Sequence, residues 1–176
     1  MKGSYLLVIS LPAEQKIAVG SLGAVHFSGG YYAYVGSALG GFKSRLNRHL
    51  RKDKTPKWHI DYLLQKAAIK SIIICEAEER VECAIAQALR REFESIPGFG
   101  SSDCKCPSHL FLAAEEMGQE IMTALNSLGL KPRLLENLSL SGIYLGVWRE
   151  TVYQEKFEGA KPLQDLCSPS PLKEKD

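Results

Sequence analysis

Phenol, guanidinium, imidazole and carboxylate side chains occur along this chain in an order that suits hydrolysis of a phosphodiester. A carboxylate can hold a divalent metal ion that polarises the phosphate and stabilises the leaving oxygen. An arginine can neutralise charge on the phosphoryl oxygens through its forked donors. A tyrosine can act as general base once its pKa, ordinarily about 10, is lowered. The candidates are Tyr5, Tyr34, Arg45, His49 and Glu82.

Strands must position the two tyrosines. Apolar, aromatic and β-branched runs predict strands over residues 5–9 and 31–35, with a hairpin over 17–27 between them. Turn-forming glycines separate these runs. The pattern is typical of an antiparallel meander.

A helix must position the arginine and the histidine. Phe42, Leu46 and Leu50 recur every four residues and predict a helix with one apolar stripe. Arg45 and His49 have the same spacing, so they project together from a neighbouring face of that helix.

The later elements complete an α+β prediction: a small antiparallel sheet flanked by helices, with a C-terminal helical extension. Glu82 flanks the apolar stripe of a helix over 81–89, which permits a half-buried carboxylate facing the sheet, although an exposed glutamate is the ordinary case. The expected domain covers residues 1–112 and the extension 113–176, with a disordered tail from about 167. The other expected elements are helices at 58–66 and 113–128 and strands at 69–75, 109–112 and 143–148.

Composition limits the class of protein. The chain has 176 residues, of which 45% are hydrophobic, and its net charge is only +2, which excludes disorder of the whole chain. No apolar run approaches the roughly 18 residues of a membrane span, and the run at 5–9 is too short for a signal peptide. Five cysteines are an odd count, unlike a secreted disulfide framework. We therefore expect a soluble cytoplasmic protein with reduced thiols and no membrane partner.

The charged residues are unevenly distributed. Seven Lys and Arg residues lie between positions 43 and 57 with a single acid, and six Glu residues lie between 76 and 94. A basic helix beside a carboxylate-bearing helix suits a polyanionic substrate held near a metal, although two separate solvated faces would give the same pattern. The candidate nucleic-acid-binding residues are Lys43, Arg45, Arg48, Arg51 and Lys52.

Taken together, these motifs resemble the GIY-YIG nuclease superfamily, and within it the small single-domain Uri-type branch. The name motif corresponds to Gly3-Ser4-Tyr5 and Tyr34-Val35-Gly36, over a match of roughly residues 3 to 112. The superfamily's helix arginine falls on Arg45, its following His or Tyr on His49, and its metal-binding glutamate on Glu82. The Uri-type branch is indicated by the segments 31–38, 58–63 and 98–106.

The chain departs from that pattern in three places. The first motif reads Gly-Ser-Tyr, and Tyr5 precedes Tyr34 by 29 residues where about a dozen are usual in the superfamily; an inserted hairpin would explain the distance. No asparagine follows Glu82 where many relatives have one, which predicts weaker positioning of the metal or the water. Gly142-Ile143-Tyr144 spells the motif literally, but the rest of the series does not follow it.

The resemblance implies a metal-dependent endonuclease that hydrolyses DNA. Glu82 would bind Mg²⁺ or Mn²⁺, Tyr5 or Tyr34 would activate water, Arg45 would stabilise the phosphate, and His49 would assist. Relatives joined to an endonuclease-III-like glycosylase suggest a DNA repair context and a repair-protein partner. Two alternatives remain open: a catalytically inactive nucleic-acid-binding module of the same fold, and an accessory protein that acts by interaction.

Each candidate also has a purely structural interpretation. The tyrosines could be packing aromatics, and the basic run could serve solubility. His59 and Asp61 could support the site or merely cap and pack a short helix.

The segment around Cys104, Cys106 and His109 allows a zinc site, but its spacing is shorter than that of common zinc motifs and favours a turn-forming loop. A fourth zinc ligand would have to come from Cys83 or His59.

Overall fold

The computed structural model describes residues 1–136 and 149–151. The helices are α1 (Phe42–Leu50), α2 (His59–Leu63), α3 (Glu82–Leu89) and α4 (Gly118–Ser127), with one 3₁₀ turn, η1 (Gly20–Leu22). The strands are β1 (Gly3–Leu11), β2 (Gln15–Ala18), β3 (Ala24–Phe27), β4 (Gly30–Ser37), β5 (Ala68–Glu76), β6 (Glu94–Ser95), β7 (Leu110–Ala113), β8 (Pro132–Glu136) and β9 (Arg149–Thr151).

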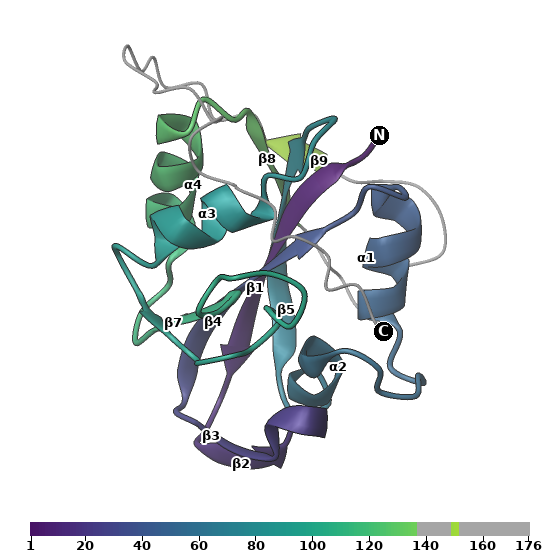
Figure 1. The fold of residues 1–176 in the computed structure, drawn as a ribbon, viewed down its shortest axis with the longest axis vertical. Coiled ribbons are helices and arrows are strands. Elements are labelled where there is room, and N and C mark those ends of the chain that lie inside the picture. The colour runs from purple at the N-terminus through teal and green to yellow at the C-terminus, as the bar shows by residue number, and fades with distance from the viewer. Residues whose placement is uncertain (137–148, 152–176) are drawn as a thin grey trace, which may run out of the picture.

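Seven of these strands form one antiparallel sheet in the order β6-β7-β4-β1-β5-β8-β9. β1 lies at the centre and pairs with β4 on one side and β5 on the other, as Figure 1 shows. The register places Tyr5 opposite Gly36 on β4 and opposite Ile74 on β5. β2 and β3 form a separate hairpin at one end of the molecule.

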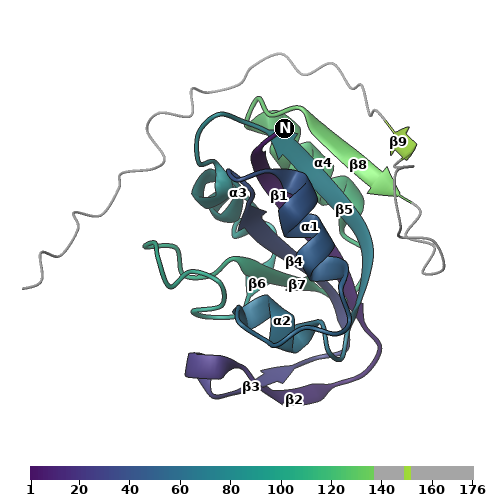
Figure 2. The ribbon, with the colours of Figure 1, turned by 90° about the vertical axis from the view of Figure 1, so that its right-hand side faces the viewer.

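Helices cover both faces of the sheet (Figures 1 and 2). Successive side chains of β1 point to opposite faces, so Tyr5 and Leu7 pack with α1 and α2, while Leu6 and Val8 pack with α3 and α4. Because both faces are covered, β1 is an almost uninterrupted apolar run rather than an alternating one.

The α+β prediction is confirmed: an antiparallel sheet is flanked by helices. The hairpin expected over 17–27 is also present, as β2 and β3. Two expected helices are shorter than predicted. α2 ends at Leu63, and the residues expected to continue it form turns. α4 begins only at Gly118, because Ala113 belongs to β7 and residues 114–117 connect the two elements.

The expected extension from residue 113 packs, as far as residue 136, on the expected domain of residues 1–112. The apolar side chains between the sheet and α1 and α2 form the first core, and those between the sheet and α3 and α4 form the second core. α4 packs against α3, and β8 pairs with β5, so residues 113–136 complete the second core and the sheet. The strand expected at 143–148, the sequence Gly142-Ile143-Tyr144 and the tail from 167 lie outside the described residues. In the described part of the chain, no helix has the length and apolar character needed to span a membrane.

Candidate active site

Gly3 allows β1 and β5 to approach closely at the start of the site. Its φ is +152°, and a Cβ there would lie 2.0 Å from the carbonyl oxygen of Cys75. The Gly3 carbonyl accepts a hydrogen bond from the Ala38 N–H at 2.7 Å, which ties β1 to the segment that leads into α1. The close approach of the two strands therefore requires a glycine at position 3, independently of any catalytic role of the site.

Gly36 provides the space for the Tyr5 ring. A Cβ at this position would lie 2.3 Å from both Cζ and Oη of Tyr5, across the β1–β4 pair. The two halves of the sequence motif are thus in direct contact, because the glycine of the second half forms the surface on which the tyrosine of the first half lies.

Substituting Gly36 by alanine is expected to displace the Tyr5 ring. Overpacking of this kind costs about 1 to 3 kcal/mol of unfolding free energy. Urea denaturation measures the loss, and Gly40→Ala is the matched control because a Cβ at Gly40 meets no described atom within 4 Å. Equal stability of the two variants would contradict this role for Gly36.

Tyr5 and His49 form the centre of the site. The Tyr5 hydroxyl lies 2.6 Å from Nε2 of His49, and their exposed fractions are 2% and 3%. The Tyr34 ring lies beside both, with centroid distances of 6.5 Å to Tyr5 and 6.3 Å to His49. Three of the five candidate side chains are therefore in one cluster.

Burial dominates the electrostatics of this cluster. It raises the pKa of Tyr34 to about 12, although the Arg45 guanidinium opposes the shift. It also raises the pKa of Tyr5 well above its ordinary value. Burial lowers the pKa of His49 to about 3, with the Lys54 ammonium acting in the same direction. Both tyrosines and the histidine are therefore neutral at physiological pH.

Trp58 holds the arginine of the site. The guanidinium carbons of Arg45 and Arg48 each lie 4.4 Å from the centroid of the Trp58 ring, and that ring also contacts His49 at a centroid distance of 5.8 Å. Cation–π contacts of this kind orient a guanidinium while its edge remains available for hydrogen bonds. This role of Trp58 was not predicted from the sequence.

Asp61 fixes the segment that carries Trp58. Its carboxylate is fully buried and accepts hydrogen bonds from Arg48 at 2.6 Å and from the backbone N–H groups of Lys57 and Trp58 at 2.9 and 3.0 Å. Lys54 Nζ lies 3.1 Å from Oδ1 of Asp61, and it donates hydrogen bonds to the backbone carbonyls of Arg48 and His49 at the end of α1. Asp61 thus both caps α2 and joins it to α1.

Glu82 lies in the first turn of α3 and is 6% exposed. Its Oε2 atom is buried without a hydrogen-bond partner among the described residues, and Oε1 lies 3.8 Å from Arg80. The Glu82 carboxylate contributes to the raised pKa of Tyr34, after burial and other charges. Its link to the cluster is therefore electrostatic, since α3 covers the opposite face of the sheet from α1.

The predicted nucleic-acid-binding residues divide into two groups. Arg45 and Arg48 are half-buried and held by Trp58, and Arg48 is also paired with Asp61, so its charge is already compensated. The other three are exposed on or just after α1: Lys43, Arg51 and Lys52.

His59 has a positioning contact with the neighbouring loop. Its Nδ1 accepts a hydrogen bond from the Gly100 N–H at 3.1 Å, and Gly100 in turn lies against the Tyr34 ring. A separate open cavity of about 690 Å³ lies between the first residues of the chain, the β4–α1 loop and the end of β5. Its lining includes none of the five candidates.

The fold and site define an α+β domain in which a buried tyrosine–histidine pair, a stacked arginine and a buried carboxylate are held around an antiparallel sheet. A family model described as "Domain of unknown function DUF123" matches residues 4–130, and the chain belongs to that family. No curated protein and no solved structure matches the chain.

Proposed function

We propose that this protein is a metal-dependent endonuclease of the GIY-YIG type that hydrolyses phosphodiester bonds in DNA. The observation that carries the proposal is the convergence of Tyr5, His49 and Arg45, with the Glu82 carboxylate acting on the same cluster through Tyr34. The described residues form one small domain, and we expect it to recognise DNA structure rather than sequence. We place it in DNA repair, where a partner protein would direct it.

Glu82 would hold the metal ion. A buried carboxylate oxygen without a hydrogen-bond partner is costly unless a cation lies against it, and among the described residues Glu82 Oε2 is such an atom. Mg²⁺ and Mn²⁺ suit this position, because Mg²⁺ is commonly bound by one or two carboxylates together with water and substrate phosphate oxygens. When bound, the ion supplies Lewis-acid stabilisation of the phosphate and the leaving oxygen.

Tyr5 would activate the attacking water through His49. A phenol is the better hydrogen-bond donor and a neutral imidazole nitrogen the better acceptor, so we assign the Tyr5 hydroxyl as donor to Nε2. Tyr5 can then take a proton from water as its own proton passes to His49. In the unbound protein the raised pKa of Tyr5 and the lowered pKa of His49 oppose this transfer.

Substrate binding would reduce that opposition. Arg45 is one of the cations that lower the pKa of His49, and a phosphodiester bound at Arg45 neutralises part of this charge. The same guanidinium would bond the phosphoryl oxygens, while Trp58 keeps it in place. The exposed cations on and after α1 would contact neighbouring phosphates.

A cleavage assay on duplex, single-stranded, flap and branched DNA, with RNA alongside and with Mg²⁺ or Mn²⁺, tests this function. Glu82→Gln is expected to lower the rate about 100-fold or more while DNA binding persists. Arg45→Ala should also abolish cutting. Glu78→Gln is the matched control, since this nearby carboxylate is highly exposed.

Two results would overturn the proposal. Salt-sensitive binding without cutting under either metal would indicate an inactive nucleic-acid-binding module. Absence of both binding and cutting, even at low salt, would indicate an accessory protein.

A further inference from the structure

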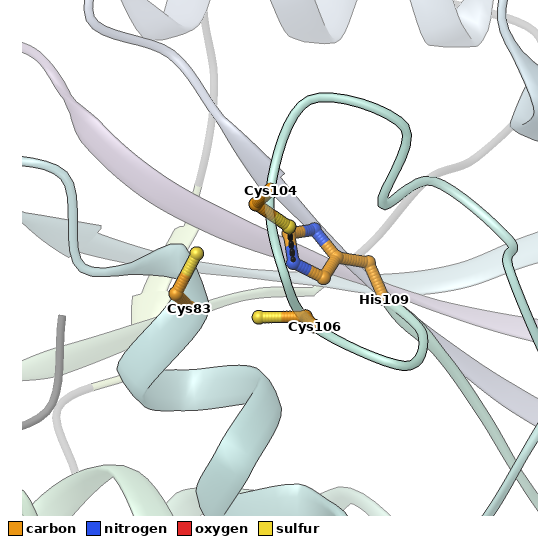
Figure 3. Close-up of side chains that lie close together, drawn as sticks. All are labelled: Cys83, Cys104, Cys106 and His109. Atoms are coloured by element: carbon orange, nitrogen blue, oxygen red, sulfur yellow. Dashed lines mark hydrogen bonds between the residues drawn. The ribbon is translucent and has the colours of Figure 1, made fainter. Parts of the chain in front are cut away.

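A second cluster of metal-ligating side chains lies beside α3. Cys83, Cys104, Cys106 and His109 offer one ligand atom each, and these four atoms all lie within 4.8 Å of one another. Figure 3 shows Cys83 reaching from the start of α3 toward the other three, which come from the loop between β6 and β7. Residues more than twenty positions apart thus meet in one place.

The distances suit a tetrahedral ion. Cys104 Sγ lies 3.5 Å from His109 Nε2. Ordinary Zn–S and Zn–N bonds place a sulfur and a nitrogen ligand about 3.6 Å apart and two sulfur ligands about 3.8 Å apart. The four ligand atoms lie within 4.8 Å of one another, so the distance between any two of them needs to shorten by at most about 1 Å. Rotation of the side chains allows a movement of this size.

The types of ligand atom in the cluster indicate which metal would bind there. Three thiols and one imidazole are soft and borderline ligands, which favour zinc over Mg²⁺ or Mn²⁺. Four protein ligands leave no open position, which is typical of a structural rather than a catalytic zinc site. None of the three cysteines is in a disulfide bond.

The loop that supplies three of the donors is long, and backbone hydrogen bonds hold its two ends together: the Gly98 N–H donates to Pro107 and the His109 N–H donates to Phe99. Fourteen residues separate β6 from β7, an unusual length for a connection without secondary structure. Ser102, Asp103 and Lys105 are exposed, whereas Phe99 is buried against the first core. A bound ion would fasten the exposed part of this loop to α3.

We infer that Cys83, Cys104, Cys106 and His109 form a structural zinc site. His59, the other ligand considered from the sequence, is not part of it, because it accepts a hydrogen bond from Gly100 instead. The site goes beyond the proposed nuclease activity and does not depend on it. The ion would join Cys83, the residue after Glu82, to the β6–β7 loop, whose Gly100 lies against Tyr34. The site would therefore position both Glu82 and Tyr34.

Zinc content of the full chain, purified under reducing conditions, tests the inference directly. We expect one zinc ion per chain, and cobalt substitution should give the thiolate charge-transfer and tetrahedral d–d absorption bands. Cys83→Ala is expected to weaken zinc binding about 100-fold or more in competition with a chromophoric chelator. Alanine is a strong helix former, so this variant should keep α3 folded.

Cys75→Ala is the matched control, because it also removes one thiol but lies in β5, within the second core. It should retain zinc binding. Substoichiometric zinc after reconstitution, or equal affinity of the Cys83→Ala variant and the wild type, would overturn the site. The readout is metal binding, so neither result depends on whether the protein cleaves DNA.

Discussion

Replacing Asp61 by alanine is expected to lower the free energy of unfolding by about 3 to 5 kcal/mol. The carboxylate is fully buried, and its removal leaves Arg48 and Lys54 without their compensating charge. It also removes the acceptor for the backbone N–H groups of Lys57 and Trp58 at the start of α2. Urea denaturation at neutral pH measures the effect.

Two further variants separate the causes. Asp61→Asn keeps an acceptor oxygen but loses the charge, so it should lie between wild type and Asp61→Ala. Asp53→Ala removes an exposed carboxylate from the same connection and should change stability by less than about 0.5 kcal/mol. Similar stabilities for Asp61→Ala and Asp53→Ala would show that the buried network contributes little.

Acid is expected to destabilise the protein through His49, starting near pH 6.5. The folded pKa of His49 is about 3, against an ordinary value of 6.5, because the ring is buried among cations. Between these values the unfolded chain binds a proton and the folded protein does not, so stability falls as pH falls. The loss amounts to roughly 4 kcal/mol by pH 3.

Other groups face His49 and titrate differently. Arg45, Arg48 and Lys54 lie around the ring. Against the effect of burial, hydrogen bonds from Trp58, Lys57 and Lys54 lower the pKa of Asp61 to about 2, so its own loss of stability belongs between about pH 4 and 2. The pKa of His59 is also lowered by burial.

His49→Gln isolates the histidine from these groups. This variant should be less stable at pH 7 yet lose much less stability between pH 6.5 and 4, as measured by denaturation at each pH. A parallel decline in wild type and variant would assign the acid sensitivity to other groups.

The sequence allowed much of the sheet to be predicted, because long apolar runs and glycine pairs mark strands without reference to their partners. The β1 and β4 strands and the hairpin between them follow from local patterns. The pairing of Arg45 with His49 on one helix also followed from spacing alone.

The support around the site could not be predicted in this way. Trp58 stacks on two arginines, and Lys54 joins Asp61 to the end of α1; both contacts depend on the turn between α1 and α2. Cys83 approaches Cys104 only because α3 packs beside the β6–β7 loop. Such contacts between distant segments leave no periodic signal in a single sequence.

The central position of β1 has a consequence for how the chain reaches its native state. Its two partners, β4 and β5, follow it in sequence, and β5 ends at Glu76. Until that segment has been synthesised, a nine-residue apolar strand has one edge unsatisfied and available to other chains. Folding that depends on such distant pairings is slow. Chaperone demand during biosynthesis should therefore be greatest before β5 emerges.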